Sequence, residues 1–164
     1  MWRDIGHQVK FVSMTNGDTG HHEMGGGPLA RRRYEETQCS AKVADLEYEV
    51  YDIHNGALVP NLFYRRKTIK TIREFTPDLV ICHRANDYHP DHRAVGVLVQ
   101  DAIFSVTIPN VVALTPAMDA PPVLGYAYDY FTEPTAYEPT VAASTDDVWE
   151  RKLQMVHCHE SQMY

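Results

Sequence analysis

The chain has 164 residues, which fits one domain of roughly 100–200 residues with its own hydrophobic core. Its net charge of −7 is spread along the sequence, which argues against nucleic acid or an anionic membrane as the main partner. The sequence contains neither an apolar run long enough to span a bilayer nor the apolar core of a signal peptide, so we expect a cytoplasmic protein.

Hydrophobic periodicity predicts strands and helices in alternation. Gly6 is typical of a helix C-cap. The stretch 7–18 is typical of a strand that ends in a turn, and the stretch from Pro28 to about Ala44 is typical of a helix. The continuous apolar run of 77–83 indicates a strand buried on both faces. The other predicted elements are strands over 46–53 and 123–131 and helices over 61–75, over 91–104 and from 144–147 onward.

This alternation predicts the fold class, an α/β, Rossmann-like domain with a largely parallel sheet and helices on both faces. Ligands of such sheets gather at the carboxyl ends of the strands. Polar residues follow three predicted strands, at 16–18, 54–56 and 83–92. We therefore expect these three loops to converge on one rim of the sheet.

The third loop carries the clearest chemistry. His89 and His92 lie three residues apart, Asp91 lies between them, and Pro90 suits the start of the following helix. Two imidazoles at this spacing can point the same way, one binding a metal while the other holds or donates a proton. A capped helix start with solvent-exposed histidines explains the same pattern, but its place after a buried strand favours a functional site.

The sequence resembles the PIG-L or LmbE-like family of zinc-dependent N-deacetylases, which act on amino sugars of the N-acetylglucosamine type. The resemblance rests on "KFVSMTNGDTG" (10–20), "HRANDYHPDHRAVG" (83–96) and "CHESQ" (158–162), in this order along nearly the whole chain. It implies zinc as the cofactor and a small amino-sugar substrate. It also implies that His92 is a zinc ligand, that His89 stabilises the oxyanion or acts as the acid, and that Asp91 orients a histidine.

Further residues match the family in loops that face the substrate. Arg33, in the pattern Arg-x-x-Glu with Glu36, matches an arginine that helps to bind substrate in relatives. The resemblance places Asp18, Asn55 and Asp87 in matching loops, so we expect these residues to contribute to substrate binding as well.

The sequence also departs from the family. Relatives carry a His-Pro-Asp-Asp motif at the end of their first strand, with two zinc ligands and the general base, and this motif is absent here. With His92 as the one matched ligand, we expect a single LmbE-like domain over 1–164, N-terminally incomplete, that binds zinc weakly and catalyses poorly. Loss of a central strand also leaves an open apolar slot, so we expect either reduced stability, with rearrangement or pairing between chains filling the slot, or another segment in its place. We also expect a homo-oligomer.

Several alternatives stay open. One is a non-catalytic family member that serves as a sugar-binding or assembly module. His21, His22 and Glu23 form either a replacement metal-binding group or a mobile loop. The aromatic residues of the strand 123–131 either stack on a sugar ring or pack within the protein; they are Tyr126, Tyr128, Tyr130 and Phe131. A nucleotide-binding domain is disfavoured because Gly-x-Gly-x-x-Gly is absent.

Overall fold

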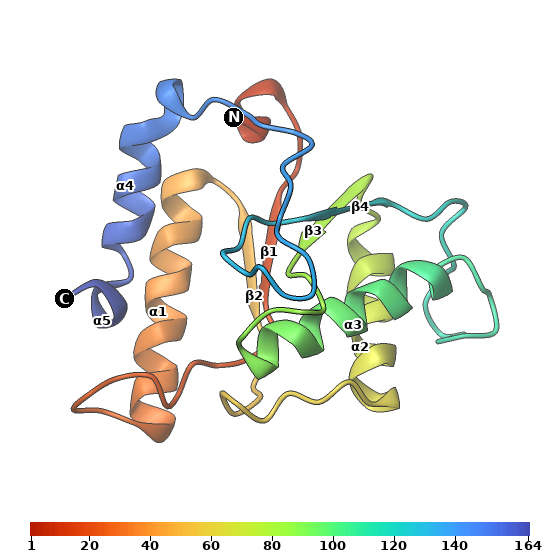
Figure 1. Ribbon diagram of the computed structural model, residues 1–164, viewed down its shortest axis with the longest axis horizontal. Coiled ribbons are helices and arrows are strands. Elements are labelled where there is room, and N and C mark those ends of the chain that lie inside the picture. Colours follow the sequence, from red (N-terminus) through yellow and green to blue (C-terminus); the bar gives the residue numbers. More distant parts are fainter. The chain divides into compact units, whose positions relative to one another are not determined.

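The computed structural model describes all 164 residues, and the chain divides into two compact units (Figure 1). The first unit contains Met1–Ala57 and Val141–Tyr164, and the second contains Leu58–Thr140. Each unit is described by itself below. None of the helices is both long and apolar enough to cross a bilayer.

The first unit is built on a pair of parallel strands joined by a helix. Strand β1 pairs with β2 so that Lys10 lies opposite Glu47 and Ser13 opposite Val50. Gly6 ends the first short helix in the left-handed conformation, with φ of 93°, as the sequence predicts. The elements of this unit are η1 (Trp2–Ile5), β1 (Lys10–Ser13), α1 (Gly26–Ala44), β2 (Glu47–Val50), η2 (Asp146–Val148), α4 (Trp149–His157) and α5 (Glu160–Met163).

Helix α1 is the centre of packing in this unit, since it contacts β2 on one side and α4 on another (Figure 1). Leu29 of α1 is fully buried, and Tyr51 and Ile53, which follow β2, are 2% and 7% exposed. Burial of such side chains contributes about 1.5–3 kcal/mol each, which holds the loop after β2 against the unit.

The second unit repeats the parallel arrangement with β3 (Leu79–Cys82) and β4 (Val123–Tyr126), in which Leu79 lies opposite Val123. Its helices are α2 (Leu62–Phe75) and α3 (Pro90–Ser105). Helix α2 begins at Asn61, whose side-chain oxygen accepts the Tyr64 N–H at 2.9 Å. Its core lies between α2 and α3 and contains Ile69, Ile72, Ala102 and Val106.

The strands form two separate parallel pairs rather than one continuous hydrogen-bonded sheet. The α/β class with parallel strands is confirmed, but the expected burial of the third strand on both faces is wrong. Leu79 and Ile81 of β3 are 40% and 51% exposed while Cys82 is 8% exposed, because side chains alternate between the two faces of a strand and the face that carries Leu79 and Ile81 is left open. Phe11 and Val12 of β1 are also exposed.

Candidate functional site

The loop between β3 and α3 is shaped by hydrogen bonds at the start of the helix. His89 is the N-cap of α3 and Pro90 follows it in the first turn, as the sequence predicts. The Nδ1 atom of His89 accepts the Asp91 N–H at 3.2 Å, and Asp87 Oδ1 accepts the His89 N–H at 3.0 Å. In the neutral ring, His89 therefore carries its proton on Nε2 and presents an N–H donor.

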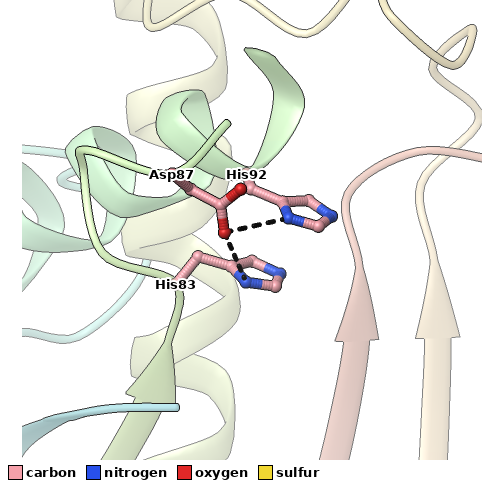
Figure 2. A group of neighbouring side chains, drawn as sticks. All are labelled: His83, Asp87 and His92. Atoms are coloured by element: carbon pink, nitrogen blue, oxygen red, sulfur yellow. Dashed lines mark hydrogen bonds and ion pairs between the residues drawn. The ribbon is translucent and has the colours of Figure 1, made fainter. Parts of the chain in front are cut away.

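Three side chains of this region form a group that we call the candidate metal centre: His83, Asp87 and His92. Each offers a ligand atom, and these atoms all lie within 4.8 Å of one another. Asp87 Oδ2 lies 3.1 Å from Nδ1 of His92 and 3.8 Å from Nδ1 of His83. The two imidazoles stack with ring centroids 3.9 Å apart, and Figure 2 shows the second nitrogen of each ring pointing away from Asp87.

Burial favours the neutral form of His83 in this centre. Asp87 is 4% exposed, and its carboxylate faces both rings. Burial, with a smaller effect from the neighbouring His92, lowers the pKa of His83 and outweighs the opposing effect of Asp87. A neutral imidazole is the form that binds a metal, so the environment of His83 favours its ligand state.

The donor set of the centre fits zinc. Two imidazoles and one carboxylate are among the ligands that zinc takes in proteins, with a further position left for water or substrate. The sequence did not predict His83 as a metal ligand, because His83 lies outside the part of the family motif, residues 89–92, that suggested a metal site. The available signal was a histidine at the end of an apolar strand with an aspartate, Asp87, four residues later.

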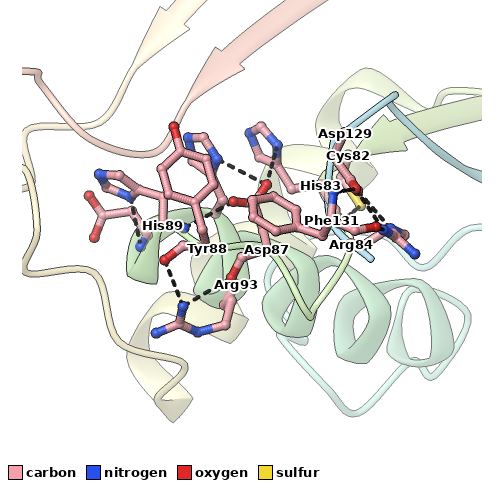
Figure 3. A network of polar contacts seen from close by, with 11 residues as sticks. Cys82, His83, Arg84, Asp87, Tyr88, His89, Arg93, Asp129 and Phe131 are labelled. Carbon is pink, nitrogen blue, oxygen red and sulfur yellow. Dashed lines mark hydrogen bonds and ion pairs between the residues drawn. The ribbon is translucent and has the colours of Figure 1, made fainter. Parts of the chain in front are cut away.

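The loop that carries the centre is held in place by two arginines (Figure 3). Arg93 Nη1 donates to the carbonyl oxygens of Asp87 and Tyr88, both at 2.9 Å. Arg84 makes two bonds of 2.6 Å to the carboxylate of Asp129 in the segment after β4. Hydrogen bonding from Arg84 lowers the pKa of Asp129, so the pair stays charged.

In the first unit, Asp18 organises the loops that follow β1 and β2. It is 8% exposed, its Oδ1 accepts the Asn55 N–H at 3.0 Å, and its Oδ2 lies 2.7 Å from Nδ1 of His54. Burial alone would raise the pKa of Asp18, but the hydrogen bonds from Asn55 and His54 together outweigh it and lower the pKa. His54 was not predicted as a site residue. Because its Nδ1 faces Asp18, its Nε2 can bind solvent or substrate.

Arg33 ties its helix to neighbouring segments of the same unit. Its guanidinium donates to the carbonyl oxygens of Gly17 and Gly20, and its Nε donates to Ser161 Oγ at 3.4 Å. Glu36 accepts both the N–H and the hydroxyl of Ser161, at 2.8 and 2.7 Å. The Arg-x-x-Glu pattern and the segment 158–162 therefore meet in one hydrogen-bond network, which orders the loop after β1.

The other residues predicted for the site are Asp91, whose side chain is buried, and the pair His21 and His22, which lies in a loop of the first unit. Asp91 is 3% exposed and its Oδ1 accepts the Leu58 N–H at 3.3 Å, while the carboxylate that contacts His92 is that of Asp87. His21 stacks on His22, and its Nδ1 accepts two amide N–H groups of its own loop. That arrangement favours a folded surface loop over a replacement metal-binding group.

Parallel α/β units with two histidines and a carboxylate gathered in a strand-to-helix loop define a class of α/β proteins with a candidate metal site. The chain belongs to the PIG-L family, described as GlcNAc-PI de-N-acetylase, whose model matches residues 1–103. The family that the sequence resembles is thereby confirmed, and the segments 10–20 and 83–96 lie within the matched residues.

Individual relatives agree with this family. The chain is 29% identical over 167 aligned residues to diacetylchitobiose deacetylase of Thermococcus kodakarensis, covering 97% of this chain and 61% of that protein. Its fold is similar to that of N,N'-diacetylchitobiose deacetylase from Pyrococcus horikoshii, with a TM-score of 0.86 and 23% identity, over 99% of this chain and 62% of that one. The chain thus spans about three fifths of the length of these relatives.

The fold alone does not specify the reaction. The chain is also similar, with a TM-score of 0.85 and 20% identity over 98% of its length and 70% of the other chain, to a 4-carboxy-2-hydroxymuconate hydratase from Pseudomonas putida. A deacetylase and a hydratase therefore share this architecture, and function has to be argued from the site.

Proposed function

We propose that the protein is a zinc-dependent hydrolase that removes an acetyl group from an amino sugar of the N-acetylglucosamine type. The candidate metal centre is the observation that carries this proposal, because it supplies two imidazoles and a carboxylate in the loop that matches the family motif. The names of the relatives, which are diacetylchitobiose deacetylases, support the substrate class.

Zinc would be held by His83, Asp87 and His92, and when bound it would act as a Lewis acid toward the amide carbonyl. The zinc ligand expected at His92 is thus joined by two further candidate ligands, His83 and Asp87, from the same loop. This donor set supports tighter binding than one matched histidine would give.

His89 would stabilise the oxygen of the tetrahedral intermediate. Its Nδ1 already accepts the Asp91 N–H, so the neutral ring offers Nε2–H to an oxygen that gains negative charge. Asp91 contributes by holding this ring in one tautomer through its backbone, and through its buried carboxylate it fixes the amide of Leu58. We therefore propose that Asp91 orients His89 through its backbone N–H.

Arg33, Asp18 and Asn55 would bind substrate through the loops that they order, with His54 Nε2 as an added contact to a sugar hydroxyl. We further propose a small amino-sugar molecule as the partner, with no nucleic acid, a homo-oligomer as the assembly, and the cytoplasm as the location.

The test is acetate release from N-acetylglucosamine and N,N'-diacetylchitobiose by the purified protein, measured together with its zinc content. We expect turnover that is slow, because the general base of the family motif is absent from the sequence, and that is lost with EDTA and restored by zinc. His92→Ala should lose both bound zinc and turnover, whereas His7→Ala, an exposed histidine outside the centre, should keep both.

The opposite results separate the alternatives. Stoichiometric zinc without acetate release from either sugar would contradict the enzyme and leave a sugar-binding or assembly module. Acetate release that persists in the His92→Ala variant would contradict the place assigned to the metal.

A further inference from the structure

Helix α1 is joined to the segment 158–162 by a row of polar contacts within the first unit, where α4 and α5 lie along α1 (Figure 1). Glu36 accepts both the N–H and the hydroxyl of Ser161, at 2.8 and 2.7 Å, and both residues are buried. Arg32 Nη2 lies 3.8 Å from a carboxylate oxygen of Glu160. These contacts fix which residues of the segment lie against which turn of α1.

This arrangement brings two cysteines together. Cys39 lies three residues after Glu36 in α1, and Cys158 lies three residues before Ser161, at the C-cap of α4. Residues three apart on a helix share a face, so Cys39 lies on the same side of α1 as Glu36. The proximity of the thiols is also evident in the ionisation of Cys158, because burial and a hydrogen bond with the Cys39 thiol raise its pKa to about 11.

We propose that Cys39 and Cys158 form a thiol–disulfide exchange site, whose co-substrate is a low-molecular-weight disulfide such as oxidised glutathione and whose product is a disulfide bond between α1 and the end of α4. Both cysteines are free thiols in the structure, which is therefore the reduced form of the pair. The inference goes beyond the proposed deacetylase, since neither cysteine belongs to the candidate metal centre.

Exposure divides the chemical roles of the two thiols. Cys39 is exposed and Cys158 is partly buried, so the oxidant meets Cys39 first. The Cys39 thiolate attacks one sulfur of oxidised glutathione, which breaks the S–S bond, forms a mixed disulfide and releases one glutathione thiolate. Cys158 then gives up its proton and attacks Cys39 Sγ, which releases the second glutathione thiolate. The two cysteines are oxidised to one disulfide, and their two protons end on the two glutathione thiols.

The second step is intramolecular. The raised pKa of Cys158 keeps it largely protonated at neutral pH, which slows its attack. Its place beside Cys39 opposes this effect, because a neighbouring group reacts at a high effective concentration. The pair should therefore close to the disulfide rather than remain as a mixed disulfide on Cys39.

The disulfide would strengthen an existing network. Arg33 Nε donates to Ser161 Oγ at 3.4 Å, and the same guanidinium holds the loop after β1. A bond between Cys39 and Cys158 keeps the segment 158–162 on α1 when these hydrogen bonds open. About 120 residues separate the two cysteines in the sequence, and closing so long a loop strongly lowers the entropy of the unfolded chain. The oxidised protein should therefore be the more stable form.

Cys82 provides an internal control. It lies in β3 of the second unit, whereas the other two cysteines belong to the first unit. Cys82 is 8% exposed, burial raises its pKa to about 11, and its thiol donates to the His83 carbonyl at 3.3 Å. We expect this thiol to stay free under conditions that oxidise the pair.

The experiment equilibrates the full chain with mixtures of oxidised and reduced glutathione, alkylates the free thiols and maps the cysteines by mass spectrometry after proteolysis. We expect peptides joined through Cys39 and Cys158, with Cys82 alkylated. The oxidised protein should unfold about 5–10 °C above the reduced protein, and dithiothreitol should reverse this shift. Cys39→Ser and Cys158→Ser should each abolish the shift, whereas Cys82→Ala should keep it.

The opposite results are equally distinct. A disulfide between chains, glutathione retained on Cys39 beside a free Cys158, or alkylation of all three cysteines would each overturn the pair. An unchanged unfolding temperature of the protein with the mapped disulfide would overturn its stabilising role. The readout is the bond itself, so failure of the proposed deacetylase in the acetate assay would leave this inference standing, and failure of the pair would leave the deacetylase.

Discussion

Asp87 Oδ2 lies 3.1 Å from Nδ1 of His92 and so links a buried carboxylate to an imidazole on the first turn of α3. We predict that Asp87→Ala lowers zinc affinity by about 100-fold or more, because the variant loses one of the three proposed ligands together with the carboxylate that orients His92. Competition with a chromogenic chelator measures the affinity.

Asp119→Ala serves as the control for Asp87, because Asp119 is an exposed aspartate of the same unit outside the metal group. It should bind zinc as the wild type does. Equal affinity of the Asp87→Ala variant and the wild type would contradict the assignment of the centre.

The contact between Asp18 and His54 predicts a pH dependence of stability. The folded protein lowers the pKa of Asp18 below its ordinary value of 3.8, so the folded state holds this carboxylate ionised more readily than the unfolded state does. Its contribution is therefore complete above pH 3.8 and is lost as the pH falls through the lower folded pKa. Asp18→Asn should cost about 1–3 kcal/mol at neutral pH through its buried hydrogen bonds.

Urea unfolding of the wild type and the Asp18→Asn variant across a series of pH values tests this. The difference in unfolding free energy should shrink at acidic pH. Asp147→Asn changes an exposed aspartate of the same unit and should show no such difference. A constant gap between wild type and Asp18→Asn at every pH would show that Asp18 does not act through its charge.

Arg73 holds the end of α3 to the loop that follows it. The residue is 3% exposed, and its guanidinium donates to backbone carbonyl oxygens, among them those of Val106 at 2.9 Å, Ile108 at 2.8 Å and Thr115 at 3.0 Å. A positive charge is favourable at a helix C-terminus, and these carbonyls have lost water. Arg73→Met should therefore lower the unfolding free energy by about 3 kcal/mol or more.

The matched control for Arg73 is Arg66→Met, on the same helix but exposed, which should stay within about 0.5 kcal/mol of the wild type. Arg73→Lys should recover little stability, because a lysine cannot reproduce the planar fork of donors. A stability of Arg73→Met equal to that of Arg66→Met would contradict the role of the carbonyl contacts.

The sequence predicts the order and type of nearly all elements because their hydrophobic periodicity is local. Helix α2 runs over Leu62–Phe75 where 61–75 is expected, and α3 over Pro90–Ser105 where 91–104 is expected. The apolar run at β3 does not predict its burial, since burial depends on what packs on each face of the strand. The exposure of Ile81 follows from the packing of the fold and not from the residue itself.

The same distinction holds at the site. His92 and His89 lie within a short motif, so spacing alone predicts that they act together. His83 is joined to the motif by one local signal, the aspartate four residues after it, whereas Asp129 reaches the region from the segment after β4 and no local pattern pairs it with residues 83–92. Arg73 appears in the sequence as one cation of an amphipathic helix, and only the fold shows it buried among carbonyl groups.

Gly96 lets α3 approach the backbone of the metal-binding loop. A Cβ at this position would lie 2.8 Å from the Ala85 nitrogen and 2.9 Å from the carbonyl carbon of Arg84, and neither backbone atom can turn aside as a side chain can. Gly96→Ala should therefore cost about 1–3 kcal/mol of stability, although alanine favours helices. Because His83 and His92 lie on the two sides of this contact, zinc affinity should fall as well. Gly27→Ala adds a Cβ that meets nothing within 4 Å in α1, so it should leave zinc affinity unchanged and stability equal or higher. Thermal unfolding with and without zinc measures both effects, and a Gly96→Ala variant as stable as Gly27→Ala would show that the loop yields to the helix without disturbing the centre.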